Sequence, residues 1–205
     1  MLAKLPLAPL SLVLLLAGCG ASSLDKDATF SPADDAGMVV IGYLPSYGID
    51  KGFGQVNFAR YDVETKKVTG ISYMGKMVGM LSDDAIVLTD KWRSARFRAY
   101  KMTPGEYVLA HADLVYGTNA MRTTFYIDTD SKALRDNSPV FTVKRGEIVY
   151  IGDVAMDFGR FPAGLAIKSD VGRAAQFVKT MPGVTNQTMT FRPLRSFVLP
   201  AAGKQ

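Results

Sequence analysis

The stretch RFRAYKMTPGEYVLAHA, residues 96–112, carries the clearest structural signal in the chain. Polar and apolar residues alternate before its centre, as in a half-buried strand, and an extended pattern continues after it. At the centre, Pro104 fixes φ for the second position of a turn, and Gly105 accepts the positive φ that a type II turn needs at the third. We therefore predict a β-hairpin with its turn at residues 103–106.

A second stretch of the same kind lies further along the chain. Residues 139–143 read PVFTV, residues 144–147 (KRGE) form a predicted turn, and residues 148–152 read IVYIG. Further strand candidates are residues 38–44, 55–62, 68–74, 122–128, 164–167 and 188–192. Short strands at regular intervals, with turn signals between them, predict a mainly β fold: an antiparallel β-sandwich.

One α-helix is predicted in the second half of the chain. Ser169 or Asp170 can cap its first turn, and Pro182 ends it. Apolar residues recur at the helical spacing i, i+3, i+4, i+7; they are Val171, Ala174, Ala175 and Val178. This spacing places the four residues on one face of the helix.

Composition excludes several classes of protein and of site. Of the 205 residues, 48% are hydrophobic and 21% are charged, which rules out wholesale disorder. A single cysteine excludes an intrachain disulfide and a thiolate metal cage. The only histidine, His111, excludes sites that need two imidazoles. We expect no cofactor and no metal.

The N-terminus has the layout of a secretory signal. Lys4 supplies a positive charge, residues 5–16 form a mostly apolar run, and Ala17 and Gly18 are small residues just before Cys19. The run is too short to cross a bilayer, because a spanning helix needs about 20 apolar residues.

Residues 16–19, LAGC, resemble the lipobox of bacterial lipoproteins. The resemblance implies cleavage between Gly18 and Cys19 and acylation of Cys19, whose fatty chains would anchor the protein to the bilayer. In enteric bacteria, an acidic residue directly after the cysteine resembles an inner-membrane retention signal. This chain has Gly20 at that position. We therefore predict a lipid-anchored protein of the bacterial cell envelope, at the outer membrane and facing the periplasm. A plain secretory signal with an incidental cysteine is the alternative.

A change in texture after the cysteine predicts the domain boundaries. Residues 20–37, GASSLDKDATFSPADDAG, are small and polar, without periodicity, which favours a flexible tether. We predict a signal peptide over residues 1–18, a lipidated cysteine and tether over 19–37, a sandwich domain over 38–199 and a tail over 200–205.

Two turn regions carry a further resemblance. Residues 100–109 and 141–153, together with the lipobox, resemble a broad group of uncharacterised bacterial lipoproteins. That group is usually taken to have a transthyretin-like or immunoglobulin-like β-sandwich. The resemblance covers about residues 95–182, and it carries over no catalytic residues.

Candidate catalytic and metal-binding residues are sparse. His111 lies near Asp113, but the chain has no G-x-S-x-G nucleophile elbow, so we interpret His111 as a half-buried or surface residue. Residues 128–131, DTDS, fail the calcium-loop pattern and indicate a polar loop. Asp153 and Asp157 are interpreted as solvated loop charges. We predict no catalytic residues.

The densest basic and aromatic cluster is KWRSARFR, residues 91–98. Interleaved cations and rings could stack on bases, but a periplasmic protein rarely meets nucleic acid, so we expect no nucleic-acid partner. Anionic lipid head groups or an acidic protein surface are the alternatives, with Trp92, Arg93 and Arg96 as candidate contacts for a partner or ligand. The structural interpretation is that Phe97 packs in the core while Arg96 and Arg98 face water.

These patterns favour a non-enzymatic interaction or structural module at the cell envelope. Its expected partners are the lipid bilayer, through acylated Cys19, and an envelope protein. One alternative is a periplasmic lipoprotein that binds a small ligand or glycan through Trp92 and nearby tyrosines. A periplasmic hydrolase that uses His111 and carboxylates is a further alternative.

Overall fold

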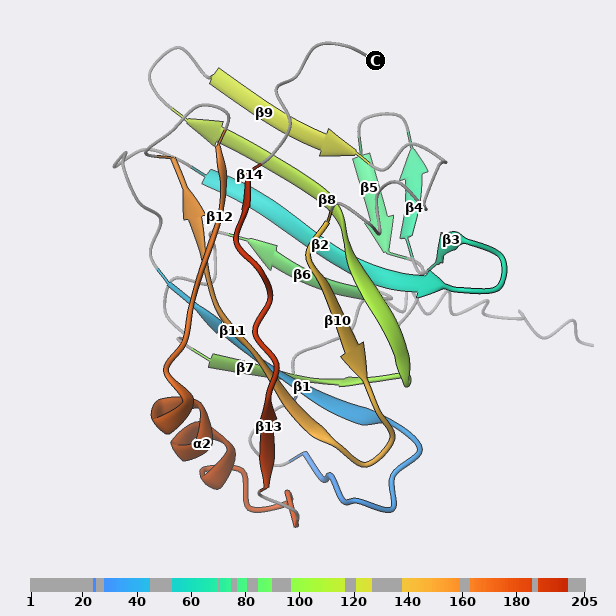
Figure 1. Cartoon of the computed structure of the whole chain (residues 1–205), viewed down its shortest axis with the longest axis vertical. Coiled ribbons are helices and arrows are strands. Elements are labelled where there is room, and N and C mark those ends of the chain that lie inside the picture. The colour runs from blue at the N-terminus through green and yellow to red at the C-terminus, as the bar shows by residue number, and fades with distance from the viewer. Residues whose placement is uncertain are drawn as a thin grey trace, which may run out of the picture.

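The computed structural model describes residues 24, 28–44, 53–69, 71–74, 77–80, 85–89, 97–116, 121–126, 138–158, 163–185 and 188–198. Their strands form two large sheets, which pack face to face, and a separate two-stranded sheet (Figure 1). One short helix, α2 (Val171–Lys179), covers part of the outer face of one large sheet. The mainly β prediction with one short helix is therefore confirmed.

The first large sheet, called sheet I, has the strand order β14-β12-β11-β1-β7, and β13 also pairs with β11. Its strands are β1 (Gly37–Tyr43), β7 (Phe97–Met102), β11 (Ile148–Asp157), β12 (Gly164–Lys168), β13 (Met189–Phe191) and β14 (Phe197–Val198). Most neighbours are antiparallel, but β11 pairs in parallel with both β1 and β13.

The second large sheet, called sheet II, has the order β10-β8-β2-β3, with β6 also on β2 and β9 also on β8. Its strands are β2 (Phe53–Asp62), β3 (Lys67–Thr69), β6 (Ala85–Thr89), β8 (Gly105–Tyr116), β9 (Met121–Tyr126) and β10 (Val140–Val143). All of its pairings are antiparallel. The two-stranded sheet joins β4 (Ile71–Met74) to β5 (Met77–Met80).

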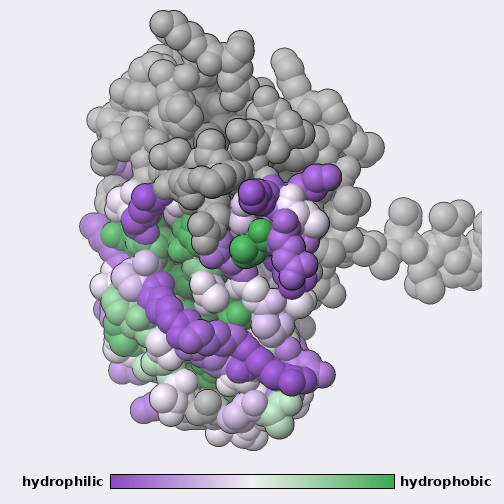
Figure 2. All heavy atoms as spheres, turned by 45° about the vertical axis from the view of Figure 1, so that its right-hand side comes forward, coloured by the Kyte–Doolittle hydropathy of each residue, from purple (hydrophilic) through white to green (hydrophobic). Residues whose placement is uncertain are grey.

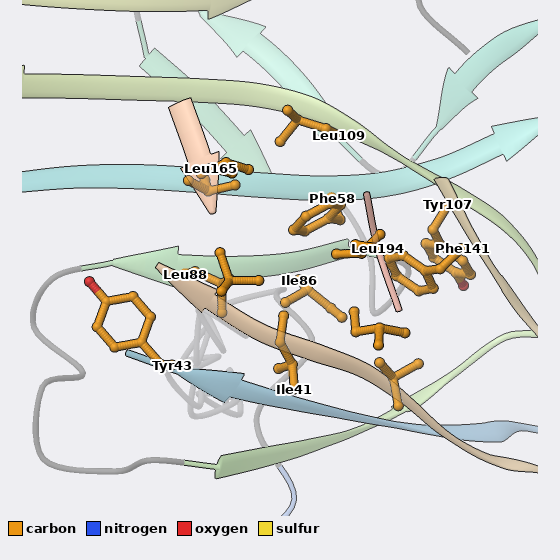
Figure 3. Close-up of a cluster of buried hydrophobic side chains, with 14 of the residues drawn as sticks. Ile41, Tyr43, Phe58, Ile86, Leu88, Tyr107, Leu109, Phe141, Leu165 and Leu194 are labelled. Carbon is orange, nitrogen blue, oxygen red and sulfur yellow. The ribbon is translucent and has the colours of Figure 1, made fainter. Parts of the chain in front are cut away.

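The central core fills the space between sheets I and II, and both sheets contribute large side chains to it (Figure 3). The rings of Phe58 and Tyr107 both pack against Phe141, with centroid separations of 5.7 and 5.2 Å. Burial of apolar surface on this scale is the main stabilising term of a sandwich.

Strand β1 is buried along its whole length, as its apolar run predicts. Val39 and Ile41 face the central core, whereas Met38 and Val40 face a second cluster on the other side of sheet I. This second cluster, called the helix-side core, also contains Ala174 and Val178 of α2. A strand covered on both faces has no polar side, which explains why its sequence does not alternate.

The first predicted hairpin is wrong in its pairing. Strand β7 ends at Met102 in sheet I and pairs with β1, whereas β8 begins at Gly105 in sheet II and pairs with β2. The turn at Thr103 and Pro104 therefore carries the chain from one sheet to the other. Tyr100 and Tyr107 meet in the central core from opposite sheets instead of lying side by side in one.

The second predicted hairpin is wrong in the same way. Strand β10 pairs with β8 in sheet II, whereas β11 pairs with β1 in sheet I, so residues 144–147 also connect the two sheets. Gly146 has φ of 64°, as the turn chemistry predicts. The turn residues were read correctly, but turn chemistry does not determine which strands pair.

The helix begins and ends close to the predicted residues. It spans Val171–Lys179, and the side chain of Asp170 accepts a hydrogen bond from the backbone N–H of Arg173 at 3.1 Å. Ala174 and Val178 are buried as predicted, but Val171 is 41% exposed and lies outside the packed stripe.

The predicted tether is wrong for residues 28–37, which belong to the folded domain. Gly37 is the first residue of β1, and Phe30 is 1% exposed within the helix-side core. The segment is polar apart from one aromatic residue, Phe30. Burial of its ring offsets the conformational entropy that the neighbouring residues lose when they become ordered. The rest of the predicted tether, apart from Leu24, lies outside the described residues.

Candidate functional site

Residues 28–36, called the docking segment, are the described stretch nearest in sequence to the predicted anchor, apart from Leu24. Leu24 itself packs against the helix-side core, and its backbone N–H donates to the carbonyl oxygen of Ala99 at 2.8 Å. Ala99 lies on β7, the last strand at its end of sheet I. The chain therefore touches the domain five residues after Cys19.

Phe30 fixes the docking segment to residues 183–185, which follow α2 in the chain. Its N–H donates to the carbonyl oxygen of Gly183 at 3.0 Å, and its own carbonyl oxygen accepts from the N–H of Thr185 at 2.9 Å. These two bonds form a short parallel bridge with Val184. The ring is thereby held among Met38, Val184 and the other members of the helix-side core.

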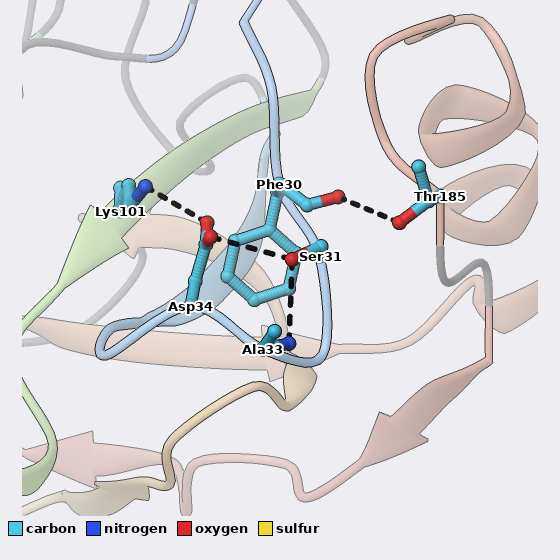
Figure 4. A network of polar contacts seen from close by, with 6 residues as sticks. All are labelled: Phe30, Ser31, Ala33, Asp34, Lys101 and Thr185. Carbon is cyan, nitrogen blue, oxygen red and sulfur yellow. Dashed lines mark hydrogen bonds and ion pairs between the residues drawn. The ribbon is translucent and has the colours of Figure 1, made fainter.

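Polar contacts hold the turn that follows Phe30 (Figure 4). Lys101 Nζ on β7 donates to Asp34 Oδ2 at 2.8 Å, and Ser31 Oγ donates to Asp34 Oδ1 at 3.4 Å. The hydrogen bond from Lys101 lowers the pKa of Asp34 below its usual value. Asp35 forms a second, exposed ion pair with Arg145.

Two glycines give the docking segment its place on the domain. A Cβ atom at Gly183 would lie 2.5 Å from the carbonyl oxygen of Ala28, and one at Gly146 would clash with the carbonyl oxygen of Pro32. Both positions allow close approach of backbone to backbone. The docking segment can therefore lie against the domain only because these two positions have no side chain.

A groove opens beside the turn between β2 and β3. It has a volume of about 410 Å³ and is lined by Arg60, Tyr61, Asp62, Val63, Glu64, Thr69, Gly105 and Glu106. Sequence reasoning predicted the turn but not the groove, because the groove also needs the start of β8, which lies more than 40 residues further along the chain.

Several charged groups of the groove are held by local hydrogen bonds. Asp62 Oδ1 accepts from the backbone N–H groups of Glu64 and Thr65 at 2.9 and 3.0 Å, and the Thr65 bond is the main reason that the pKa of Asp62 is lowered. Arg60 Nη2 donates to the carbonyl oxygen of Pro104 at 3.3 Å. The groove therefore presents fixed charges of both signs, which suits recognition of a polar surface.

His111 is buried, with 4% of its surface exposed, so the expectation of a half-buried or surface histidine is wrong. It lies on β8 opposite Asn57 of β2, and Asn57 Nδ2 is 3.3 Å from His111 Nδ1. Asp113 is two residues along the same strand and half-buried.

Asp153 is also buried, at 1% exposure within β11, so the prediction of a solvated loop charge is wrong. The hydroxyl of Tyr150 donates to Asp153 Oδ1 at 2.5 Å and accepts from the backbone N–H of Asp170 at 3.0 Å. Gly42 makes room for the carboxylate, because a Cβ atom there would overlap it. This network joins sheet I to the start of α2. Asp157, the last residue of β11, is half-buried.

We expect Tyr150→Phe to lower the free energy of unfolding by about 1.5–3 kcal/mol near neutral pH, because it removes a hydrogen bond to a buried carboxylate. Burial, followed by the bond to Asp153, raises the pKa of Tyr150. Its contribution is therefore fully present below pH about 10, the pKa of an unfolded tyrosine, and declines above it.

Urea unfolding at pH 8 and pH 10.5 measures both effects. The matched control is Tyr107→Phe, whose hydroxyl donates to the uncharged carbonyl oxygen of Thr103 at 2.8 Å; it should cost about 1 kcal/mol. A Tyr150→Phe deficit that is smaller than that of the control, or that grows at the higher pH, contradicts this account of the network.

The predicted contact and lipidation residues lie outside the described part of the chain. They are Gly18, Cys19, Trp92, Arg93 and Arg96. The end of the basic cluster is described: Phe97 is half-buried and stacks on Phe177 of α2, with ring centroids 5.9 Å apart. Arg98 is half-buried rather than fully exposed.

Within the described ranges, no three His, Cys, Asp or Glu side chains are grouped so that they could hold a metal ion. The helix in these ranges is neither long nor apolar enough to cross a membrane. Comparison of the chain with protein-family models, curated proteins and solved structures finds no match. The resemblance to bacterial lipoproteins therefore stays a prediction.

Proposed function

We propose that this protein is a lipid-anchored, non-enzymatic interaction or structural module of the bacterial cell envelope, at the outer membrane and facing the periplasm. The observation that carries the proposal is the lipobox LAGC at residues 16–19, behind a charged start and a short apolar run. Acyl chains on Cys19 would hold the protein at the bilayer, because each buried CH₂ group contributes about 0.8 kcal/mol.

The folded domain supports a binding role more than a catalytic one in this proposal. The groove beside the β2–β3 turn is open and lined largely by charged and polar groups, including Arg60, Asp62 and Glu106. Small-molecule pockets are usually apolar with a few polar groups, whereas charged surfaces of both signs give specificity to protein contacts. A protein partner therefore suits the groove better than a small ligand or glycan does.

The test of the anchor is Cys19→Ser in the native host. The variant is expected to accumulate as an unlipidated precursor and to leave the membrane fraction, because serine has no thiol to carry an acyl chain. Fractionation followed by intact mass measurement reads out both effects. The matched control is Ser22→Ala, which leaves the lipobox intact and should not change the distribution. An unchanged membrane fraction and mass for Cys19→Ser would refute the anchor.

A further inference from the structure

We infer that the domain is held close against the membrane in one orientation, with the helix-side face of sheet I toward the lipid head groups and the β2–β3 turn directed away. This inference rests on the proposed anchor at Cys19 and adds which surface the bilayer contacts. The helix-side face is defined here by α2, β7 and Leu24.

The length of chain between the anchor and the domain limits the separation. Leu24 is already bonded to Ala99 of β7, and five peptide steps separate Leu24 from Cys19. Each step covers at most about 3.6 Å, so the two Cα atoms cannot be more than about 18 Å apart. The predicted long tether would have allowed several times that distance.

The domain is wider than this reach. A folded chain of the described length has a radius of gyration of about 14 Å, which corresponds to a diameter of about 36 Å. A body of that width, held at one point of its surface by a leash of about half its diameter, cannot turn its opposite side to the bilayer. The side that carries Leu24 must face the membrane.

The docking segment keeps the attachment point in place. Phe30 is buried in the helix-side core and paired with Gly183 and Thr185, so the chain near Leu24 is held on the domain at two positions. Peeling Leu24 away would lengthen the leash only as far as this second attachment.

The exposed groups of α2 suit a lipid surface. Arg173 and Lys179 are both exposed, and Lys179 lies in the last turn of the helix. Asp170 forms an ion pair with Arg173 at 3.5 Å, which balances the charge of Arg173. The charge of Lys179 therefore leaves the helix with a small net positive charge. Basic side chains near a bilayer are attracted to anionic head groups.

The opposite side carries the groove. In Figure 1 the helix and the β2–β3 turn lie on opposite sides of the molecule. Figure 2 turns the β2–β3 side toward the viewer and shows hydrophilic residues crossing its described surface. Val63, at the tip of the turn, is 60% exposed. In the inferred orientation this side faces a partner in the aqueous space.

Energy transfer to the membrane tests the orientation. Gln176→Cys on the exposed face of α2 and Val63→Cys in the β2–β3 turn each add one thiol, and acylation leaves Cys19 unreactive. The acylated full-length variants are labelled with a donor dye and placed in vesicles of neutral and anionic phospholipids that carry a head-group acceptor. Transfer from position 176 is expected to exceed that from position 63 severalfold.

A linker variant serves as the control. Twenty Gly and Ser residues inserted between Ser23 and Leu24 have a root-mean-square span of about 25 Å and a far longer maximum, so they should reduce the difference. Equal transfer from both positions without the linker, in protein that is acylated and vesicle-bound, would overturn the orientation alone. Protein with a bare Cys19 that stays off the vesicles would overturn both the orientation and the proposed anchor.

Discussion

Replacing Phe30 with alanine is expected to lower the free energy of unfolding by about 3–5 kcal/mol. The ring is 1% exposed and contacts a core built from β1, β11 and α2. Its removal leaves a cavity and also weakens the bridge that ties the docking segment to Val184. A loss of this size is a large fraction of the stability of an ordinary domain.

Urea unfolding of the wild-type and variant proteins measures the loss. The matched control in the same segment is Asp35→Ala, which removes only an exposed ion pair with Arg145 and should change stability by about 1 kcal/mol or less. If Phe30→Ala costs no more than this control, the docking segment is not part of the cooperative fold, and the close attachment at Leu24 loses its support.

Replacing Leu194 with alanine is expected to cost about 2–5 kcal/mol. Leu194 is 4% exposed in the central core, and its N–H donates to the carbonyl oxygen of Ile151 at 2.9 Å. On either side of it, Arg192 makes a paired contact with Glu147, the last residue of the turn before β11, and Arg195 donates to the carbonyl oxygen of Ser138 at 2.8 Å. Residues 192–195 therefore bond both to β11 of sheet I and to the chain just before β10 of sheet II, and they close the edge between the two sheets.

Thermal and urea unfolding measure this second loss. The matched control is Val63→Ala, which shortens an aliphatic side chain that is 60% exposed and should alter stability by no more than about 0.5 kcal/mol. Equal stabilities for the two variants would contradict the contribution of Leu194 to the core at the edge between the two sheets.

Local signals in the sequence were sufficient for individual elements. Strand β1 was predicted because an unbroken apolar run is typical of a strand covered on both faces, and both faces are covered. The helix was predicted because a capping Asp170, an apolar stripe and a terminal proline agree within a dozen residues.

Long-range features were not predictable in the same way. The turn at residues 144–147 has the expected positive φ at Gly146, but the predicted type II turn at residues 103–106 is wrong, because Gly105 has a φ of 157° and is already the first residue of β8. Turn residues also do not tell whether the chain reverses within one sheet or crosses to the opposite sheet. The interpretation of Asp153 as a solvated charge is wrong because its burial depends on Tyr150 and on the missing side chain of Gly42.

The candidate site also combines a feature that the local sequence predicts with one that depends on long-range packing. The resemblance of residues 16–19 to a lipobox is a local pattern, so the sequence alone proposes the anchor, and Cys19 lies outside the described residues. The place where the chain meets the domain depends on Leu24 and Phe30, which look unremarkable in a polar segment until the helix-side core is assembled around them. Only the structure shows that the predicted tether of residues 20–37 is shortened, because the chain already contacts the domain at Leu24.

Intact mass measurement of the polypeptide purified from its native membrane tests the anchor most directly. We expect a chain that begins at Cys19 and carries the added mass of fatty acyl groups on that residue. A chain that still carries residues 1–18, with an unmodified thiol at position 19, would contradict the anchor, the envelope location and the membrane-facing orientation together.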